Sequence, residues 1–514
     1  MLSRVYSHCI LGIDAYQVEI EVDLATGMSY FNIVGLPDAA IKESRDRIKS
    51  AIKNSNLHFP VKKITMNLAP ADVEKKGSAL DLPMAIGILS ASGQINTTKA
   101  QEYSMVGELG LDGLLRRING ALPIAVGVRA SGKKGIILPK ENANEASVVE
   151  GIDIIPVESL RQTVDFLNGG ENIKPHKIDI EKVFKESRRY SEDFRDVKGQ
   201  EHVKRALEVA AAGGHNVIMI GPPGSGKTML AKRTSTILPD MTLPESIETT
   251  KIHSIAGLTQ ASTSLIATRP FRYPHHTISD IALIGGGAYP KPGEVSLAHN
   301  GILFLDEMLE FKRFVLEVMR QPLEDGIVNI SRASMSLTFP ARFLLIGAMN
   351  PCPCGNLTDP SKVCTCTPIQ IQRYMSRVSS PLLDRIDIHI DVPAVKISEL
   401  SKKESGDSSA EIRKRVNTAR KVQLDRFKNH PHLFCNAHMS PKEIKIFCQI
   451  DTESTKILES AIEKLGLSAR AYDRILKVSR TIADLEGSSN ILINHTSEAI
   501  HYRTLDRNLW RQGL

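Results

Sequence analysis

Residues 221–228 read GPPGSGKT and stand directly after the apolar run NVIMI and directly before the helical run MLAKRTSTIL. A glycine-rich loop between a buried strand and a helix is the context that a phosphate-binding loop requires. Its backbone N–H groups can surround phosphate oxygens, and the following helix N-terminus adds a favourable dipole. In such a loop the lysine reaches the outer phosphates and the last hydroxyl binds Mg²⁺. The pattern predicts an ATP site formed by Gly221, Pro222, Pro223, Gly224, Ser225, Gly226, Lys227 and Thr228.

Polar residues end the next two apolar runs, GILFLDE and FLLIGAMN. Carboxylates at the end of a buried strand are costly unless they handle a metal or a proton. We therefore expect Asp306 to hold Mg²⁺ through water and Glu307 to polarise the attacking water. Asn350 can orient that water or the γ-phosphate. The structural alternatives are a strand-to-helix cap by Asp306 and a turn cap by Asn350.

The length, composition and charge of the whole chain limit the class of protein. Its 514 residues exceed one hydrophobic core, and 42% hydrophobic with 24% charged residues is typical of a folded globular protein. A net charge of +7 permits nucleic acid binding without establishing it. No apolar run is long enough to span a bilayer, and Asp14 interrupts any signal-like core, so we expect a cytoplasmic protein.

Composition and periodicity predict the domain order. Residues 1–170 alternate short β-type runs with helical stretches and indicate an α+β domain, and residues 171–192 indicate a linker. Residues 193–393 contain nearly continuous apolar strands, which are typical of a parallel sheet covered by helices. Residues 394–514 are helical in pattern and predict a helical lid.

The order of these motifs resembles that of the AAA+ ATPases. The stretch RPFRYPHHTISDIALIGGGAYPKPGEVSLAHNGILFLDE, from Arg269 to Glu307, is similar to the magnesium-chelatase and ComM/YifB branch of that class. The resemblance covers essentially the whole chain. It implies ATP and Mg²⁺ as cofactors, a homo-oligomeric ring, expected to be a hexamer, and no membrane partner. It also implies translocation or branch migration of single-stranded or branched DNA in recombination and natural transformation, with a chelatase-type protein-remodelling motor as the alternative.

The same resemblance implies four further site residues. Val197 and Gln200 in DVKGQ would flank the adenine. Arg385 in PLLDRIDIHI matches an arginine finger and Arg470 in LSARAYDR matches the sensor 2 arginine, and both imply a ring because such groups act on a neighbour's nucleotide. The alternative for each arginine is a structural ion pair.

The N-terminal stretch KKGSALDLPMAIGILSA resembles the peptidase domain of Lon proteases, which has a ribosomal S5 domain 2-like fold. Ser78 would lie near the nucleophile of that family. The region that should supply its lysine reads GALPIAVGVRA, without a lysine, and a serine without a general base is a poor nucleophile. We expect a non-proteolytic domain, in which Lys133 and Lys134 lie beyond the helix. An ATP-dependent peptidase is the third class of function, against which the missing lysine argues.

Four of the seven cysteines cluster in NPCPCGNLTDPSKVCTCTP: Cys352, Cys354, Cys364 and Cys366. Four thiolates can close a tetrahedral zinc site and so fix a loop that has no core of its own. The single residue between the cysteines of each pair departs from the usual zinc spacing. Structural zinc, reduced free thiols and a redox role therefore all stay open.

Two segments are candidates for contact with DNA. RPFRYPHHTIS contains Arg269 and Arg272, and residues 326–343, GIVNISRASMSLTFPARF, predict a β-hairpin with Arg332 near its turn. In related ring motors, insertions at these places point into the central channel. The alternative is that Arg332 is a solvated hairpin residue and that the other two arginines pair with acids at a subunit interface.

Overall fold

The computed structural model describes residues 2–186, 190, 192–287, 289–332, 335–359, 361–394, 406–430 and 433–505. Residues 187–189 and 191 of the predicted linker, and 395–405 with 506–514 of the predicted lid, lie outside the described residues. The chain divides into two compact units, Met1–Arg188 with Leu243–Ala267, and Arg189–Thr242 with Thr268–Leu514. A segment that follows the phosphate loop in sequence therefore lies with the N-terminal unit.

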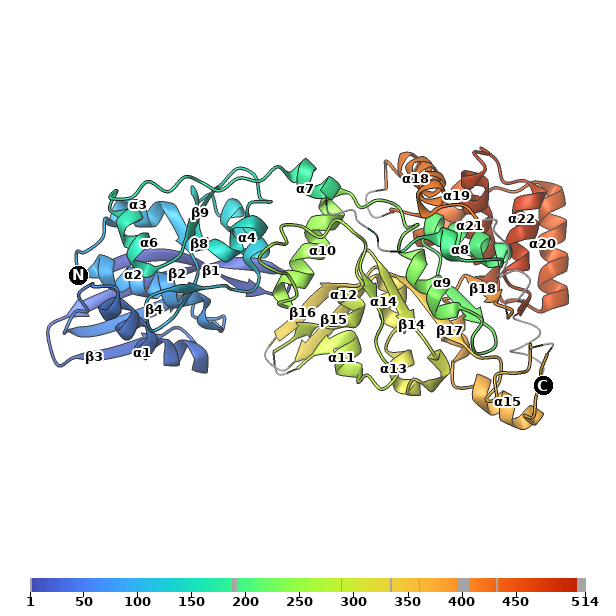
Figure 1. Cartoon of the computed structure of the whole chain (residues 1–514), viewed down its shortest axis with the longest axis horizontal. Helices are drawn as coiled ribbons and strands as arrows, with labels where there is room; N and C mark the ends of the chain where they lie inside the picture. The colour runs from blue at the N-terminus through green and yellow to red at the C-terminus, as the bar shows by residue number, and fades with distance from the viewer. Residues whose placement is uncertain are drawn as a thin grey trace. The chain divides into compact units, whose positions relative to one another are not determined.

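The first unit is built on a mixed sheet, which in the described residues has seven strands in the order β3-β4-β2-β1-β5-β8-β9 (Figure 1). β1 and β2 form a long antiparallel hairpin, and Gly12 at φ 63° permits its two-residue turn. β5, β8 and β9 continue the sheet in parallel. The strands are β1 Leu2–Leu11, β2 Asp14–Ala25, β3 Tyr30–Val34, β4 Lys63–Ala69, β5 Tyr103–Met105, β8 Gly135–Pro139 and β9 Asp153–Val157, with a small hairpin of β6 Glu108–Leu109 and β7 Leu115–Arg116.

Helices pack on this sheet and form the core. Every residue of α2 is buried, as expected for a helix that is apolar all round. A Cβ on Gly87 of α2 would lie 2.8 Å from Cγ2 of Val22, so only glycine allows this close approach to the sheet. The helices are α1 Ala39–Asn54, α2 Asp81–Ala91, α3 Thr97–Glu102, α4 Ala121–Ala130, α5 Ala143–Ala146, α6 Leu160–Leu167 and, within the predicted linker, α7 Ile180–Glu186.

The helix α10, Leu243–Ile255, packs against α4 in the first unit (Figure 1). The buried carboxylate of Glu145 accepts a hydrogen bond from the Ser254 hydroxyl, and Lys251 pairs with Asp14 at 2.9 Å. A polar group that is both buried and paired fixes geometry, because breaking the pair leaves an unsatisfied charge. The segment after α9 is thus anchored to the N-terminal unit by specific side chains.

The second unit contains a parallel sheet, in the described residues five strands in the order β11-β14-β17-β10-β18. Its three central strands are apolar and buried, which confirms the predicted parallel sheet. The strands are β10 Val217–Ile220, β11 Phe271–Arg272, β14 Ile302–Leu305, β17 Leu344–Met349 and β18 Ile388–Asp391, with two hairpins of β12 Gly285–Gly286 and β13 Lys291–Pro292, and of β15 Ile327–Arg332 and β16 Met335–Pro340.

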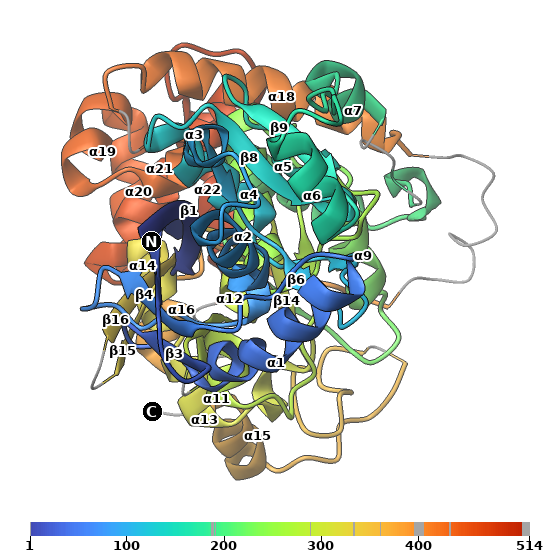
Figure 2. The ribbon, with the colours of Figure 1, turned by 90° about the vertical axis from the view of Figure 1, so that its left-hand side faces the viewer.

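The C-terminal helices share one hydrophobic core with this sheet. Figure 2 shows α18 to α22 gathered into one group, and α18 and α21 pack against α8. In the described part of the chain, every helix is too short or too polar to span a bilayer. The helices are α8 Glu201–Gly213, α9 Lys227–Thr234, α11 Asp280–Ile284, α12 Glu294–Leu297, α13 Arg313–Glu317, α14 Arg320–Asp325, α15 Pro368–Met375, α16 Ser380–Leu383, α18 Ser409–Arg426, α19 Pro441–Phe447, α20 Thr452–Leu465, α21 Ala469–Leu485 and α22 Ile493–His501.

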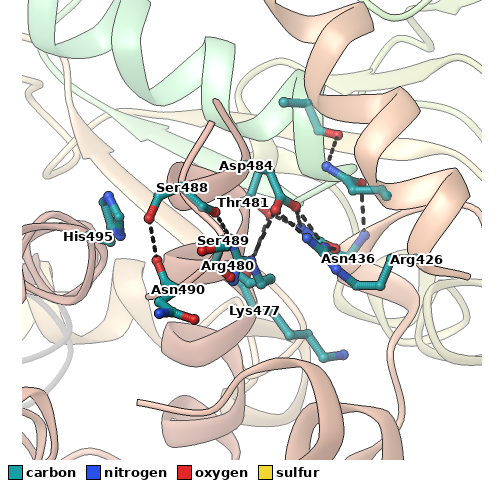
Figure 3. Close-up of polar contacts among 12 residues, drawn as sticks. Arg426, Asn436, Lys477, Arg480, Thr481, Asp484, Ser488, Ser489, Asn490 and His495 are labelled. Carbon is teal, nitrogen blue, oxygen red and sulfur yellow. Dashed lines mark hydrogen bonds and ion pairs between the residues drawn. The ribbon is translucent and has the colours of Figure 1, made fainter. Parts of the chain in front are cut away.

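A buried polar network ties α18 to α21 (Figure 3). The carboxylate of Asp484 on α21 accepts hydrogen bonds from Arg426 on α18 and from Asn436, both at 2.8 Å. Arg480 donates to the same carboxylate at 3.0 Å, and Thr481 accepts from Asn436 at 3.0 Å. Because the charged groups of this cluster are paired with one another, they fix the position of α18 relative to α21.

Candidate nucleotide and metal sites

The phosphate loop begins directly after β10, and its last two residues, Lys227 and Thr228, open α9, the strand–loop–helix context that the sequence predicts. Gly224 and Gly226 have φ of 79° and 87°, a region that side chains rarely adopt. A Cβ on Gly221 would lie 2.1 Å from the Val392 carbonyl oxygen. The glycines therefore allow the tight turn that brings backbone N–H groups to the start of α9, where an anion is stabilised.

Lys227 is buried beneath the loop. Its Nζ donates to the carbonyl oxygens of Gly221 and Pro222 at 2.7 and 2.9 Å, and lies 3.4 Å from Oδ1 of Asn350. Burial lowers the pKa of this ammonium group, while the charges of Asp306 and Glu307 act in the opposite direction. Neutral carbonyl acceptors can be exchanged for phosphate oxygens, which bind an ammonium more strongly.

Thr228 and Asp306 meet at the carboxyl end of the sheet. The Thr228 hydroxyl donates to Oδ2 of Asp306 at 2.7 Å. Asp306 follows β14, and Asn350 follows β17, the neighbouring parallel strand. A hydroxyl and a carboxylate in contact are oxygen donors of the kind that Mg²⁺ takes, so these residues fit the metal that the sequence predicts.

Glu307 has an unusual backbone, with φ 49° in the left-handed region. A non-glycine residue there stores about 1–3 kcal/mol of strain, and such strain concentrates at functional sites. The side chain is 59% exposed, and Nδ1 of His276 lies 3.6 Å from its Oε2. The carboxylate is therefore turned away from the core, where it can meet water.

Gln200 contacts the phosphate loop directly. Its side-chain amide donates to the carbonyl oxygen of Ser225 at 3.0 Å and to that of Pro393 at 2.9 Å. Val197 is fully buried in the same segment. The structure thus brings DVKGQ against the loop, while contact of Val197 and Gln200 with adenine stays a prediction.

The two candidate trans-acting arginines lie close together. Nη1 of Arg470, at the start of α21, is 3.8 Å from Oδ2 of Asp384. Arg385, the next residue in sequence, is buried and donates to the carboxylate of Glu324 and to the Pro381 carbonyl oxygen. To bind a phosphate, the Arg385 guanidinium would therefore have to break its ion pair with Glu324.

A second ion pair fixes α21 against the segment that carries Arg385. The buried carboxylate of Asp387 pairs with Arg474, one turn after Arg470, and lies 3.1 Å from Nδ1 of His215. Arg474 and His215 hold the pKa of Asp387 well below its usual value despite its burial. The two arginines are consequently placed as one group.

The four clustered cysteines come together in the loop after Asn350. Their sulfur atoms all lie within 4.8 Å of one another, and Sγ of Cys352 is 3.4 Å from that of Cys354 and 3.7 Å from that of Cys364. A tetrahedral site with Zn–S bonds of about 2.3 Å has S···S distances of about 3.8 Å. Backbone N–H groups lower the pKa of Cys354 to about 6, which favours the thiolate that metals bind, whereas burial raises the pKa of Cys352 to about 12. This cluster can bind a metal ion.

The cysteine loop also touches the phosphate loop. A Cβ on Gly355 would lie 2.5 Å from Cδ of Pro223, and Gly355 itself has φ 79°. Glycine is therefore required for this close contact. The cysteine loop therefore packs against one side of the phosphate loop, and a metal ion that fixed the cysteine loop would also support the nucleotide site.

Arg269 and Arg272 are engaged within their own chain. Arg269 donates to the carbonyl oxygens of Pro239 and Asn300 at 2.5 and 2.8 Å. Arg272 makes a bidentate pair with Glu294 at 2.6 and 2.7 Å. These contacts favour a structural role, and DNA binding by these two residues stays a prediction.

The sequence motifs do not single out Tyr273 and His276, which follow Arg272. The structure places them beside the acidic strand end, with the Tyr273 hydroxyl 3.0 Å from Asp306 and His276 near Glu307. Their approach depends on how the chain turns after the two-residue strand β11. The signal that could have found them is the unusual concentration of aromatic and histidine residues in RYPHH.

Arg332 is exposed at the end of β15, in the hairpin that the sequence predicts. A Cβ on Gly286 would lie 3.3 Å from Nη2 of Arg332, and one on Gly285 would lie 3.0 Å from Ile330. The glycines of β12 thus allow two hairpins to lie against each other. Residues 333–334 of the turn are outside the described residues.

In the N-terminal unit, the Ser78 hydroxyl donates to the carboxylate of Glu108. Lys133 donates to the Gln101 carbonyl oxygen at 3.0 Å, and Lys134 pairs with Glu102 at 3.2 Å. Both ammonium groups are thus engaged with residues other than Ser78. The absence of peptidase activity in this domain stays a prediction.

The parallel sheet, the phosphate loop and the acidic strand end define an AAA+ ATPase. Family models agree along the chain: magnesium chelatase subunit ChlI over residues 193–400, subunit ChlI of Mg-chelatase over residues 20–142, and the ChlI C-terminal region over residues 406–503. The chain belongs to the ComM/YifB family of magnesium-chelatase-like proteins.

Individual relatives support the same assignment. Competence protein ComM of Haemophilus influenzae is 45% identical over 99% of this chain and 98% of its own length. The uncharacterized protein YifB of Escherichia coli is 44% identical, with the same coverage of both chains. Lon protease 2 of Bacillus subtilis is 29% identical over 32% of this chain and 33% of its own length, in agreement with the Lon-like fold of the N-terminal domain.

Proposed function

We propose that this chain forms a ring of identical subunits, expected to be a hexamer, that couples ATP hydrolysis to translocation or branch migration of DNA. The similarity to a competence protein over 99% of the chain supports a role in recombination and natural transformation. The domains 1–170, 193–393 and 394–514, with the linker 171–192, would correspond to a non-proteolytic Lon-like domain, the motor core and the lid. In the motor, Glu307 polarises the attacking water, while Asn350 orients it.

Thr228 and Asp306 would hold Mg²⁺, which would neutralise charge on the phosphates. Lys227 would contact the outer phosphates from its place under the loop. Arg385 and Arg470 would enter a neighbouring subunit's nucleotide site, where an arginine stabilises charge on the γ-phosphate. The cysteine cluster would hold a structural Zn²⁺ ion that fixes the loop beside Pro223.

The observation that carries the DNA assignment is the exposed guanidinium of Arg332 at the end of β15, beside the second hairpin β12–β13. In a ring, one Arg332 from each subunit would meet successive backbone phosphates. Such contacts are salt-dependent and nearly indifferent to base sequence.

The test replaces Arg332 by alanine and measures affinity for single-stranded DNA over a series of salt concentrations. We expect weaker binding, and the slope of log affinity against log salt concentration (the salt slope) should fall in magnitude by about 0.7 for each phosphate that the variant no longer neutralises. Basal ATPase activity and ring assembly should persist. Arg373→Ala, the same change at an exposed arginine of α15, serves as the control and should leave both quantities unchanged.

An unchanged affinity and salt slope in Arg332→Ala would place the DNA track elsewhere. Such a result would favour the alternative function, a chelatase-type motor that remodels a partner protein. The matches to magnesium chelatase models along the chain are the observation that keeps this alternative open.

A further inference from the structure

The carboxylate of Asp306 accepts hydrogen bonds from three donors, two of which come from other segments of the second unit. Its Oδ2 accepts from the Thr228 hydroxyl at 2.7 Å and from the Tyr273 phenol at 3.0 Å. Its Oδ1 accepts from the backbone N–H of Glu307 at 3.0 Å. A carboxylate has about four lone-pair positions, so one position on Oδ1 is left for a further donor.

Tyr273 is itself positioned by its neighbours. Its ring lies 5.0 Å from that of Phe304 in β14, and Phe304 also stacks on Phe271 at 5.9 Å. The bidentate pair of Arg272 with Glu294 anchors the preceding residue. Two independent contacts, one apolar and one ionic, therefore aim the phenol at Asp306.

The phenol of Tyr273 is a hydrogen-bond donor to Asp306. A phenol is protonated at neutral pH, so the Tyr273 hydroxyl can donate a hydrogen bond to Asp306. The residue is nevertheless 47% exposed, and water could satisfy its hydroxyl without Asp306. Core packing alone thus does not explain why the hydroxyl points at the carboxylate.

We propose that Tyr273 is a positioning residue of the magnesium site, which fixes the orientation of Asp306 for the metal. This inference rests on the proposed function, since it requires a site for Mg²⁺ and ATP. Hydrogen-bond partners of metal-binding carboxylates orient them, and their loss typically lowers metal affinity about 10–100-fold. Thr228 cannot replace this support alone, because its hydroxyl is itself a candidate metal ligand.

Tyr273→Phe tests the proposal, because phenylalanine keeps the ring on Phe304 and removes only the hydroxyl. Binding of a fluorescent ADP analogue is titrated with Mg²⁺ and, separately, measured in EDTA. We expect the half-saturating Mg²⁺ concentration to rise about tenfold, in line with the effect of such partners. Nucleotide affinity in EDTA should not change, and ATPase activity should return at excess Mg²⁺.

Tyr30→Phe, which removes an exposed phenol from the N-terminal unit, is the matched control and should leave the Mg²⁺ requirement unchanged. An unchanged or lowered Mg²⁺ requirement in Tyr273→Phe would overturn the proposal. A thermal unfolding midpoint equal to that of the wild type shows that the variant is folded. Absence of ATP hydrolysis by the wild type at every Mg²⁺ concentration would refute the proposed ATPase function, a result distinct from failure of the role of Tyr273.

Discussion

Nη1 of Arg470 lies 3.8 Å from Oδ2 of Asp384, the residue directly before Arg385. The pair of Asp387 with Arg474 fixes the same two segments one turn further along. Because the two candidate arginines are held together, they should act on one nucleotide. If Arg385 acts on the neighbour's ATP, Arg470 should do so as well.

We predict that Arg385→Ala abolishes turnover in every subunit that still binds ATP. A finger arginine is worth about a thousandfold or more in rate. Mixing this variant with Glu307→Gln subunits should restore some activity. At some interfaces of a mixed ring, an intact Glu307 from one subunit meets an intact Arg385 from its neighbour. Steady-state ATPase rates over a range of mixing ratios measure this.

The same mixing with Arg470→Ala should give the same pattern of recovery. Assembly of mixed rings is checked with differently tagged subunits. Absence of recovery at all ratios, in rings shown to be mixed, would mean that the arginines act within their own subunit.

Glu307→Gln should leave ATP binding intact and reduce hydrolysis by about 10²–10⁴-fold, since the amide keeps the shape but cannot polarise water. Lys227→Ala should instead weaken binding, because it removes the buried ammonium beneath the loop. Equilibrium binding and single-turnover hydrolysis separate the two effects. Near-normal turnover in Glu307→Gln would show that another group is the base.

The fold was largely predictable because its signals are local. The apolar strands, the glycine-rich loop and the amphipathic helices are readable from neighbouring residues, and the structure and the family models confirm the mixed α/β fold with a parallel sheet and a helical C-terminus. The sequence assigns Thr228 and Asp306 to the same Mg²⁺ ion, so the two residues are expected to lie close together. Their roles stay predictions, while their contact is observed.

Contacts that depend on long-range packing were not predictable. Tyr273 meets Asp306 across 33 positions, and Ser254 meets Glu145 across 109. Periodicity and motifs do not specify such pairs, because they depend on how separate elements pack. For the same reason, the placement of α10 with the N-terminal unit could not be inferred from the pattern of residues around it.

The cluster at Glu145 should hold the segment Leu243–Ala267 in place. Glu145→Gln removes the charge that Ser254 and Arg117 contact, and we expect local stability to fall by about 1–3 kcal/mol. Hydrogen exchange of residues 243–267 should become faster. Glu141→Gln, at an exposed position nearby, should have no effect, and equal exchange in both variants would contradict the anchoring role.

Purified protein, prepared without chelators, should contain about one zinc ion per chain, held by four thiolates. Replacing Cys352 and Cys364 by serine should remove the metal and lower stability more than nucleotide affinity, because the ion fixes a loop. Cys9→Ala, in the N-terminal unit, should keep the zinc. Elemental analysis decides the question, and less than about a tenth of an equivalent in the wild type would exclude a zinc site.

The central claim is that ATP hydrolysis by this chain is coupled to DNA. The most direct measurement is the steady-state ATPase rate of the full chain without DNA and with single strands, duplex or a four-way junction, at one fixed salt concentration. We predict that single-stranded or branched DNA raises the rate several-fold, and that Arg332→Ala loses this increase while it keeps the basal rate. An ATPase rate that no DNA changes would contradict the account and favour a motor that acts on a partner protein.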